Sequence, residues 1–153
     1  MSVLQERMKQ KTFQNAGQEA MLNLIAASDH VRDRLNCLCQ KKNISIAQYN
    51  ILRILKGKFP QGYPRSEIAS RMVERAPDIT RIIDRMVSNG LVVRLKSEED
   101  MRKSIAVITQ KGINILVELN KLIHTYQINF QNQISKKQCE NLTNICDSIL
   151  RLD

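Results

Sequence analysis

The chain has 153 residues, of which 42% are hydrophobic and 25% charged, and its formal net charge is +9. This composition suits one domain, or two closely packed ones, with a buried core, and it excludes a disordered tail. Aromatic residues make up 4% and Trp is absent, which argues against an RNA-binding sheet that stacks bases on exposed rings.

The net excess of positive charge lies in the first 111 residues. Residues 1–111 contain 20 Lys and Arg against 11 Asp and Glu, whereas residues 112–153 contain four of each. A basic excess favours a polyanionic partner, either nucleic acid or an anionic membrane surface. No apolar run reaches the ~20 residues of a membrane span, and the N-terminus lacks the apolar stretch of a signal peptide. We therefore expect a cytoplasmic protein with reduced cysteines. A membrane-surface protein would carry an amphipathic helix with a lysine-rich polar face, and the basic residues here are not arranged so, which predicts no membrane partner.

A long helix is predicted from about Phe13 to Lys42. Apolar residues recur along it in steps of three and four, with Ser28 as the polar member of the series: Met21, Leu24, Val31, Leu35 and Leu38. This heptad seam is typical of a helix that packs on a partner helix. The length of the helix favours pairing with a second chain, and an ordinary core helix is the alternative.

Three shorter helices are predicted next. The first begins at a capping box formed by Ser45 and Gln48. The two that follow, over residues 65–73 and 77–90, are short and joined by a tight connection, which predicts a helix-turn-helix. The apolar face of the last one consists of Ile79, Ile82, Ile83 and Met86.

After Gly90 the repeat of apolar residues changes from about 3.6 to about 2 residues, which is the period of a strand. Residues 91–96 and 104–109 alternate in this way and enclose a charged tip, so they predict a hairpin. A helix-turn-helix followed by a hairpin is a winged helix.

Two helices close the chain, one capped by Thr109 and the other opened by Ser135 with Gln138. The predicted fold is mainly α with a small β-hairpin wing. Residues 44–111 form a winged helix-turn-helix for DNA binding, and residues 1–43 and 112–153 form flanking dimerisation helices.

The outer face of the predicted helix 77–90 carries Arg81 and Arg85, one helical turn apart. Like charges at that spacing repel, so a helix built only for stability would place a glutamate at one position. An α-helix fits the major groove of B-DNA, where arginine donates two hydrogen bonds to guanine O6 and N7. We predict that both arginines contact DNA; a merely solvated helix face is the alternative.

Further DNA contacts are predicted around these arginines. Asp78 and Thr80 flank them on the same helix, and Arg94 lies on the first strand of the hairpin. Arg102 and Lys103 lie at the wing tip, where an arginine can enter the narrow minor groove.

The acidic residues of this region are expected to have basic partners. Asp84 is expected to pair with Arg85 or Arg94, and Asp100 with Arg94. For Asp78 two roles are open: accepting a hydrogen bond from a cytosine amino group, or offsetting the arginines.

The sequence resembles the MarR family of bacterial transcriptional regulators over nearly its whole length, and most closely from Ile44 to Gly112. The stretches that carry the resemblance are SEIASRM, PDITRIIDRMVSNGLVVR, EEDMRKS and ITQKG. The wing of that family reads Asp, one or two Arg, a strand and Leu-Thr-x-x-Gly, which Asp100, Arg102, Thr109 and Gly112 match here.

The chain departs from the family pattern at two places. Met101 stands where the family often has another arginine, so the wing is expected to make one contact fewer. Pro77 and Asp78 stand where many members have small hydroxyl residues.

The resemblance implies a triangular homodimer that binds double-stranded DNA at a palindromic operator, acting as a repressor by the habit of the family. It also implies a small aromatic or phenolic effector that binds between the dimer helices and the DNA-binding lobe and releases the DNA. In this chain the corresponding ligand residues are His30, Arg34, Tyr49 and Tyr63.

Two other functions are open, and an enzyme is not expected. Some relatives sense oxidants through cysteine, although inert buried thiols are the default for Cys37, Cys39, Cys139 and Cys146. A winged-helix module for protein association, without a role at DNA, is the second. The sequence has no phosphate loop, catalytic pair or metal-ligand spacing, so we predict no enzyme activity, no cofactor and no metal.

Overall fold

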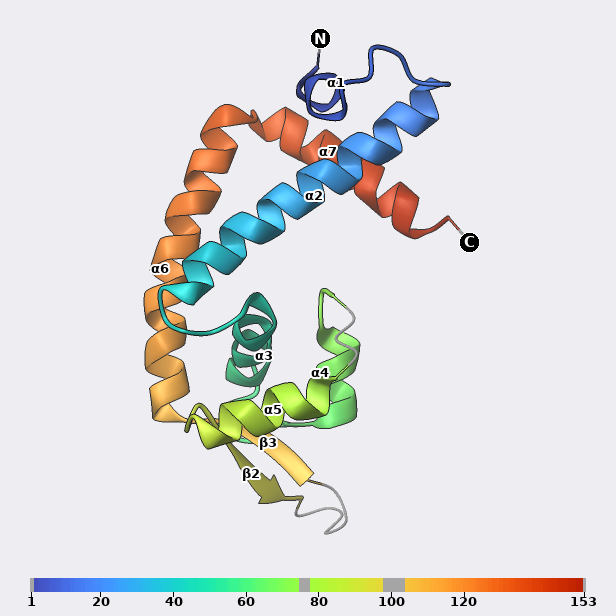
Figure 1. Ribbon diagram of the computed structural model, residues 1–153. Coiled ribbons are helices and arrows are strands. Elements are labelled where there is room, and N and C mark those ends of the chain that lie inside the picture. The colour runs from blue at the N-terminus through green and yellow to red at the C-terminus, as the bar shows by residue number, and fades with distance from the viewer. Residues whose placement is uncertain (1, 75–77, 98–103, 153) are drawn as a thin grey trace.

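The computed structural model describes residues 2–74, 78–97 and 104–152, and it is mainly helical with one small sheet (Figure 1). The elements are α1 (Val3–Met8), α2 (Ala16–Gln40), α3 (Ile46–Lys56), β1 (Tyr63–Pro64), α4 (Arg65–Arg71), α5 (Ile79–Ser88), β2 (Val92–Lys96), β3 (Ser104–Ile108), α6 (Gln110–Gln133) and α7 (Lys136–Leu150). Helix α6 runs from the hairpin at one end of the molecule to α7 at the other, where α2 crosses α7 (Figure 1). The predicted class, mainly α with a β-hairpin wing, is confirmed.

Side-chain caps fix where several helices begin. Ser45 Oγ accepts a hydrogen bond from the Gln48 amide at 3.2 Å, and Gln48 Oε1 accepts one from the Ser45 amide at 2.9 Å. Ser135 and Gln138 repeat this capping box at the start of α7. These are the two boxes that the sequence predicted, because the spacing of the two side chains is what the geometry requires.

The two helices nearest the N-terminus differ from the prediction. Helix α2 begins at Ala16, three residues later than expected, because Asn15 caps it through a bond from the Gln18 amide at 2.9 Å. The short helix α1 was not predicted, although it has a capping box of its own at Ser2 and Gln5. A six-residue helix is too short for its apolar period to stand out in a sequence.

The sheet has three antiparallel strands in the order β1-β3-β2, one more than the predicted hairpin. The segment before α4 was expected only to break the chain, yet Tyr63 and Pro64 pair with β3 opposite Ala106 and Ile105. Gly62 allows the chain before β1 to lie close to β3. It has a φ of +74°, and a Cβ there would lie 2.2 Å from the Ala106 carbonyl oxygen.

One continuous core joins the middle of the chain to α6. Its fully buried side chains include Ile51, Leu52 and Leu55 of α3, Ile68 of α4, Ile83 and Met86 of α5, Ile108 of β3 and Leu119 of α6. Burying each such side chain contributes about 1.5–3 kcal/mol, so α3 and α5 are held firmly against the wing and α6.

The junction between wing and α6 explains the residues of the Thr-x-x-Gly motif. Thr109 Oγ1 donates to the Gly90 carbonyl oxygen at 2.7 Å and accepts from the Gly112 amide at 3.1 Å. A Cβ on Gly112 would lie 2.5 Å from the Leu91 carbonyl oxygen. The motif therefore locks the start of α6 onto the end of α5 and the beginning of the wing.

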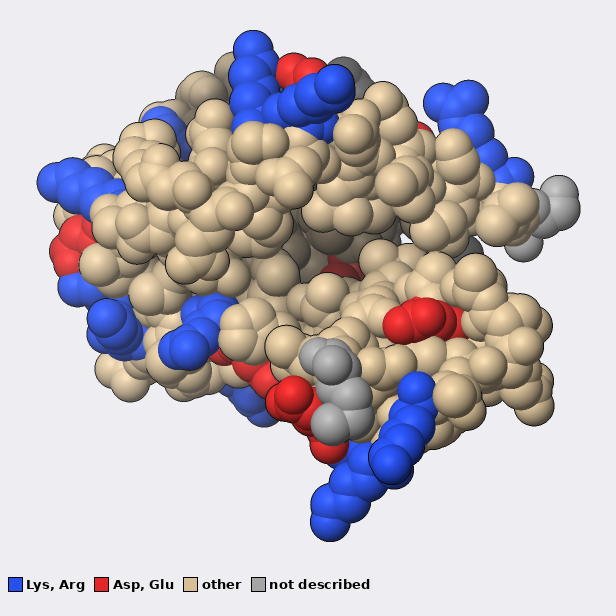
Figure 2. Space-filling model, turned by 90° about the horizontal axis from the view of Figure 1, so that it is seen from above, with Lys and Arg blue, Asp and Glu red and all other residues tan. Residues whose placement is uncertain are grey.

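The opposite end of the molecule leaves apolar side chains uncovered. Met21 and Ile25 of α2 are 66% and 56% exposed, and Ile145 of α7 is 57% exposed. Viewed from this end, the surface is mostly uncharged and hollowed in its middle, with Lys and Arg at its margins (Figure 2). The first half of the heptad seam predicted on α2 is thus not buried by the single chain.

No helix in the described part of the chain is both long and apolar enough to span a bilayer.

Candidate nucleic-acid interface and ligand cavity

Helix α5 has one buried face and one basic face. Ile79, Ile83 and Met86 are buried in the core, whereas Arg85 is exposed and the Arg81 side chain is 86% exposed. The packing of the apolar face fixes the rotation of the helix, so both arginines lie on its solvent-facing side. This is the arrangement that the sequence predicted for a helix that enters a DNA groove.

Asp78 caps α5 and lies beside one of these arginines. Its Oδ1 accepts from the Arg81 amide at 3.2 Å, and its Oδ2 lies 3.2 Å from Arg81 Nε. Of the two roles that were open for Asp78, the free chain shows the one in which the carboxylate offsets the arginine. An acidic group at a helix N-terminus also interacts favourably with the helix dipole.

Two contacts tie α5 to its neighbours. Arg65 Nη1 at the start of α4 donates to Thr80 Oγ1 at 2.7 Å, and Arg94 Nη2 of the wing lies 2.6 Å from Asp84 Oδ1. The predicted pairing of Asp84 with Arg94 is confirmed. Three of the four residues border a hollow of about 260 Å³ between α5 and the wing, which is lined by Arg65, Thr80, Ile83, Arg94, Ser104 and Ala106.

Several predicted residues of the wing tip lie outside the described residues: Asp100, Arg102 and Lys103. Their expected contacts stay predictions. Helix α5 and strand β2, which carry the described candidates, lie with β3 at the end of the molecule away from α7 (Figure 1). The described candidates at this end are Asp78, Thr80, Arg81, Arg85 and Arg94.

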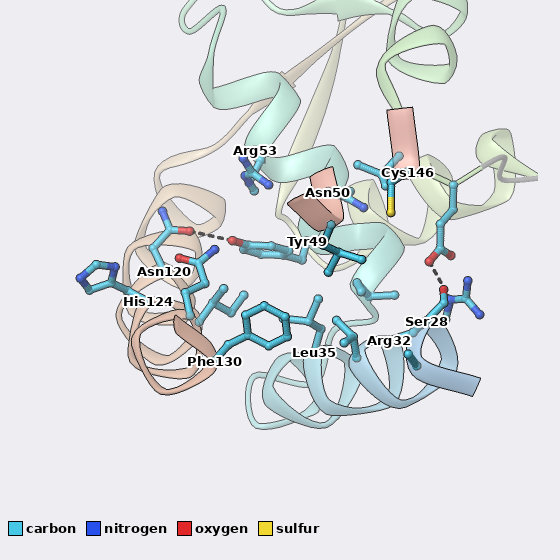
Figure 3. Close-up of a pocket in the computed structure, with 18 of the residues that line it drawn as sticks. Ser28, Arg32, Leu35, Tyr49, Asn50, Arg53, Asn120, His124, Phe130 and Cys146 are labelled. Carbon is cyan, nitrogen blue, oxygen red and sulfur yellow. Dashed lines mark hydrogen bonds and ion pairs between the residues drawn. The ribbon is translucent and has the colours of Figure 1, made fainter. Parts of the chain in front are cut away.

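We call the described part of residues 44–111 the central lobe. A cavity of about 1120 Å³ lies between this lobe and helices α2, α6 and α7 (Figure 3). Its wall comes from α2, α3, α6, α7 and the chain just after α4. The lining residues are Leu24, Ala27, Ser28, Val31, Arg32, Leu35, Ile46, Tyr49, Asn50, Arg53, Val73, Glu74, Asn120, Lys121, Ile123, His124, Gln127, Phe130, Ile134, Leu142 and Cys146. Twelve of these 21 residues are hydrophobic and nine are polar or charged, so the wall combines apolar surface with polar groups that can orient a small molecule.

Two polar groups of the wall, on α3 and α6, contact Tyr49. Its hydroxyl donates to Asn120 Oδ1 at 3.0 Å (Figure 3), and the Arg53 guanidinium carbon lies 5.9 Å from its ring centroid. Burial raises the pKa of Tyr49, so its phenol is neutral at physiological pH. The phenol therefore offers a hydroxyl, and Arg53 a positive charge, to a molecule in the cavity.

Arg32 connects α2 to the chain that leads into α5. Its Nε lies 2.7 Å from Glu74 Oε1, and its Nη1 lies 2.8 Å from Asp29 Oδ1. The bond to Glu74 is the main reason that the pKa of Arg32 is raised, with Asp29 adding to it. The Arg32–Glu74 pair could not be predicted from a local pattern, because the two residues are 42 positions apart in the chain.

Of the four predicted ligand residues, Tyr49 lines the cavity. His30 and Arg34 are exposed on α2 and lie outside its wall, as does Tyr63 of β1. The Tyr63 ring has Arg71 and Lys58 near it, with centroid distances of 4.7 and 5.3 Å.

A signal for the cavity-facing residues was present in the sequence. The predicted heptad seam of α2 supplies Leu24, Ser28, Val31 and Leu35 to the wall. A ligand site expected on the apolar side of α2 would have led to these positions, since His30 and Arg34 lie off the seam. The polar residues Asn120 and His124 on α6 had no comparable signal.

The cysteines differ in their surroundings. All four thiols are free in the described chain. Burial raises the pKa of Cys39 to about 11, which suppresses the reactive thiolate. Cys37 is exposed, and Cys146 lines the cavity. Among the described residues, no three His, Cys, Asp or Glu side chains are grouped as metal ligands.

Comparisons with known proteins agree with this architecture. Residues 44–104 match the model of the MarR family. The chain is 27% identical over 96 residues to the HTH-type transcriptional regulator MhqR of Bacillus subtilis, a match that covers 63% of this chain and 65% of that protein. It is 24% identical over 129 residues to the homoprotocatechuate degradative operon repressor of Escherichia coli, covering 84% of this chain and 86% of the repressor.

A solved structure extends the likeness to most of the molecule. The MarR transcription factor from Planctomyces limnophilus superposes with a TM-score of 0.67 at 29% identity, covering 89% of this chain and 98% of that one. The matched segment 44–104 holds α3, the helix-turn-helix and the start of β3. Residues 44–104 thus match the MarR family, and the chain as a whole has the fold of the MarR transcription factor to which it is 29% identical.

Proposed function

We propose that the protein is a sequence-specific transcriptional repressor that binds a palindromic DNA operator as a homodimer. The observation that carries this proposal is the basic face of α5. Arg81 and Arg85 are exposed on a helix whose opposite face is fully packed, and the wing lies beside it. In the major groove these arginines have guanine O6 and N7 as acceptors.

The uncovered apolar surface supports the homodimer. Residues 1–43 and 112–153 form the dimerisation region in this proposal, and residues 44–111 bind DNA. A two-fold axis through the α2 and α7 surface would present two copies of α5 to one face of the duplex. Half-sites are then separated by about 34 Å, one turn of DNA.

The cavity supports release by a small aromatic or phenolic effector. It lies between helices of the proposed dimerisation region and α3 of the DNA-binding part, so a molecule inside it touches both. The Escherichia coli relative is named as the repressor of a degradative operon, which supports repression as the mode of action.

The alternatives find less support. A surface for protein association would present apolar or aromatic anchors, whereas the outer face of α5 presents charged side chains. An oxidant sensor needs an accessible thiolate. Burial disfavours the thiolate of Cys39, so of the described thiols the exposed Cys37 is the candidate for this alternative.

Fluorescence anisotropy of the purified protein on labelled DNA tests the proposal. The probe is a fragment from upstream of the protein's own gene, and the control is random DNA of equal length, each at two salt concentrations. We expect tight, salt-sensitive binding that prefers the upstream fragment. Weak and equal binding to both fragments, repeated with a pool of random duplexes, would contradict it.

A further inference from the structure

Arg65 lies where the sheet, α4 and α5 meet, and it was not among the DNA contacts predicted from the sequence. Tyr63 and Pro64 pair with Ala106 and Ile105, and α4 begins at the next residue, so this pairing places Arg65 beside the first residues of β3. From there Arg65 Nη1 donates to Thr80 Oγ1 on α5 at 2.7 Å. Both residues line the hollow between α5 and the wing.

The charge of Arg65 has no carboxylate beside it in the described part of the chain. Arg71, Arg81 and Arg94 each lie 3.2 Å or less from an Asp or Glu oxygen. The contact described for Arg65 is instead the Thr80 hydroxyl. Among the described residues, no Asp or Glu lines the hollow. Because arginine stays protonated in proteins, the hollow has a net positive charge and attracts an anion.

The hydrogen bond from Arg65 determines how Thr80 can bind a partner. Five hydroxyls in the described helices donate to a carbonyl oxygen three or four residues earlier in the same helix: Ser70, Ser88, Thr125, Thr143 and Ser148. Thr80 is the second residue of α5, so its helix has no carbonyl at that distance. In the described chain its Oγ1 accepts from Arg65 and donates to no residue. Its hydrogen therefore points away from the guanidinium, where an acceptor on a bound molecule can receive it.

The position of the hollow is that of a DNA strand in the proposed complex. There α5 enters the major groove and the wing reaches the adjacent minor groove. One sugar-phosphate strand separates these two grooves, so it crosses the protein between α5 and the wing. Arg65 and Thr80 line the hollow at this place. Phosphate oxygens carry negative charge and accept hydrogen bonds, which matches a cation and a hydroxyl donor.

We propose that Arg65 and Thr80 together hold one backbone phosphate of the DNA in this hollow. The inference rests on the proposed function and adds Arg65 to its DNA-binding residues. The guanidinium has five N–H donors, so Arg65 donates to the phosphate while one N–H keeps the bond to Thr80. The Thr80 hydroxyl donates to the same phosphate. This contact sets the position of α5 along the strand and reads no base, in contrast to Arg81 and Arg85.

The salt dependence of DNA binding tests the contact of Arg65. Anisotropy gives the affinity at several salt concentrations, on a duplex selected from a random pool and on a random duplex of equal length. Arg65→Gln should weaken binding to both duplexes by a similar factor. The slope of log affinity against log salt should become shallower by about two, one for each subunit of the dimer. Arg65→Lys keeps the charge and should keep most of the slope.

Arg34→Gln is the matched control for the change of charge. Arg34 is exposed on α2 and lies outside the lining of the hollow, so its loss lowers the net charge equally and should leave the slope unchanged. Circular dichroism confirms that each variant is folded before its binding is measured.

A cycle of substitutions at Arg65 and Thr80 tests whether the two residues share one phosphate. Thr80→Val removes the hydroxyl and should weaken binding about 10-fold for each subunit on the DNA, the size of a hydrogen bond to a charged group. Thr80→Ser keeps the hydroxyl and should restore most of the affinity. Arg65→Gln combined with Thr80→Val should lose less than the product of the two single losses, because both act through the same phosphate.

Two results would overturn the inference. One is a slope for Arg65→Gln equal to that of Arg34→Gln, and the other is single losses that simply multiply in the double variant. A wild type that binds no DNA would overturn the inference together with the proposed function. Equal binding of the selected and random duplexes, with the slope change of Arg65→Gln present, would contradict the proposed function alone.

Discussion

Helices α3 and α7 show how differently the two ends of this molecule are stabilised. Helix α3 has 11 residues, five of which are buried within the chain itself. Helix α7 has 15 residues, all described, and buries none of them, although Ile145 and Ile149 are apolar. The central lobe therefore has its own core in one chain, whereas α2 and α7 leave apolar side chains exposed, which the proposed homodimer would bury. Substitutions in the core, on α7 and on α5 test this difference and the DNA-reading surface.

The largest effect is expected from the core of the central lobe. Leu52 is fully buried, so Leu52→Ala removes contacts and leaves a cavity, which should lower the free energy of unfolding by about 2–5 kcal/mol. Urea denaturation followed by circular dichroism measures it. Ile128→Ala on α6 is the control, because that side chain is 44% exposed and should cost far less. Equal losses in both variants would show that the lobe does not have the packed core described here.

A charge on the α7 surface should separate the two chains without unfolding the lobe. Ile145→Asp places a carboxylate in the proposed dimer contact, and the monomer should lose about 100-fold in operator affinity because binding is no longer bivalent. Light scattering gives the mass, and anisotropy gives the affinity.

Asn144→Asp is the control for that charge, since Asn144 is exposed and polar on the same helix. It should leave the dimer intact. An Ile145→Asp protein that stays dimeric would mean that the apolar face of α7 has another partner.

Within the DNA-reading surface, Arg81→Ala should lose sequence preference. A base-reading arginine contributes about 1–3 kcal/mol to discrimination, and Arg81 is the most exposed of the described arginines in ion pairs. Competition titrations with specific and random DNA measure the preference. Arg53→Ala, on α3 at the cavity, is the comparison and should leave the preference unchanged. Equal losses of Arg81→Ala on both kinds of DNA would contradict base reading.

The smallest effect is expected at the start of α5. Asp78→Ala removes the cap on the Arg81 amide and should cost about 1 kcal/mol of stability. Asp78→Asn keeps a capping oxygen and removes the charge, so thermal unfolding should show it close to the wild type. If Asn behaves like Ala, the carboxylate acts through its charge beside Arg81 and not as a cap.

The sequence predicted those parts of the fold that depend on local patterns. The capping boxes at Ser45 and Ser135, the cap at Thr109, and the outward arginines of α5 follow from spacing along the chain. Strand β1 could not be predicted, because two residues pair only when β3 is already in place opposite Tyr63.

The candidate sites show the same distinction between local sequence patterns and contacts of distant residues. Arg81 and Arg85 were found because the face of a helix is set by its period. The pairs Arg32–Glu74 and Tyr49–Asn120 join residues distant in the chain, so their contact depends on the packing of whole helices. The His30 and Arg34 predictions drew on family resemblance, and the cavity instead uses the seam residues beside them.

Selection of the dimer's binding site from a pool of random duplexes tests the central claim most directly. We predict enrichment of a palindrome whose half-sites are one helical turn apart, about 10 base pairs from centre to centre. Loss of that enrichment with Ile145→Asp should accompany loss of the dimer. Enrichment of a single, non-palindromic sequence, or of none, would contradict the account of two α5 helices presented by one symmetric dimer.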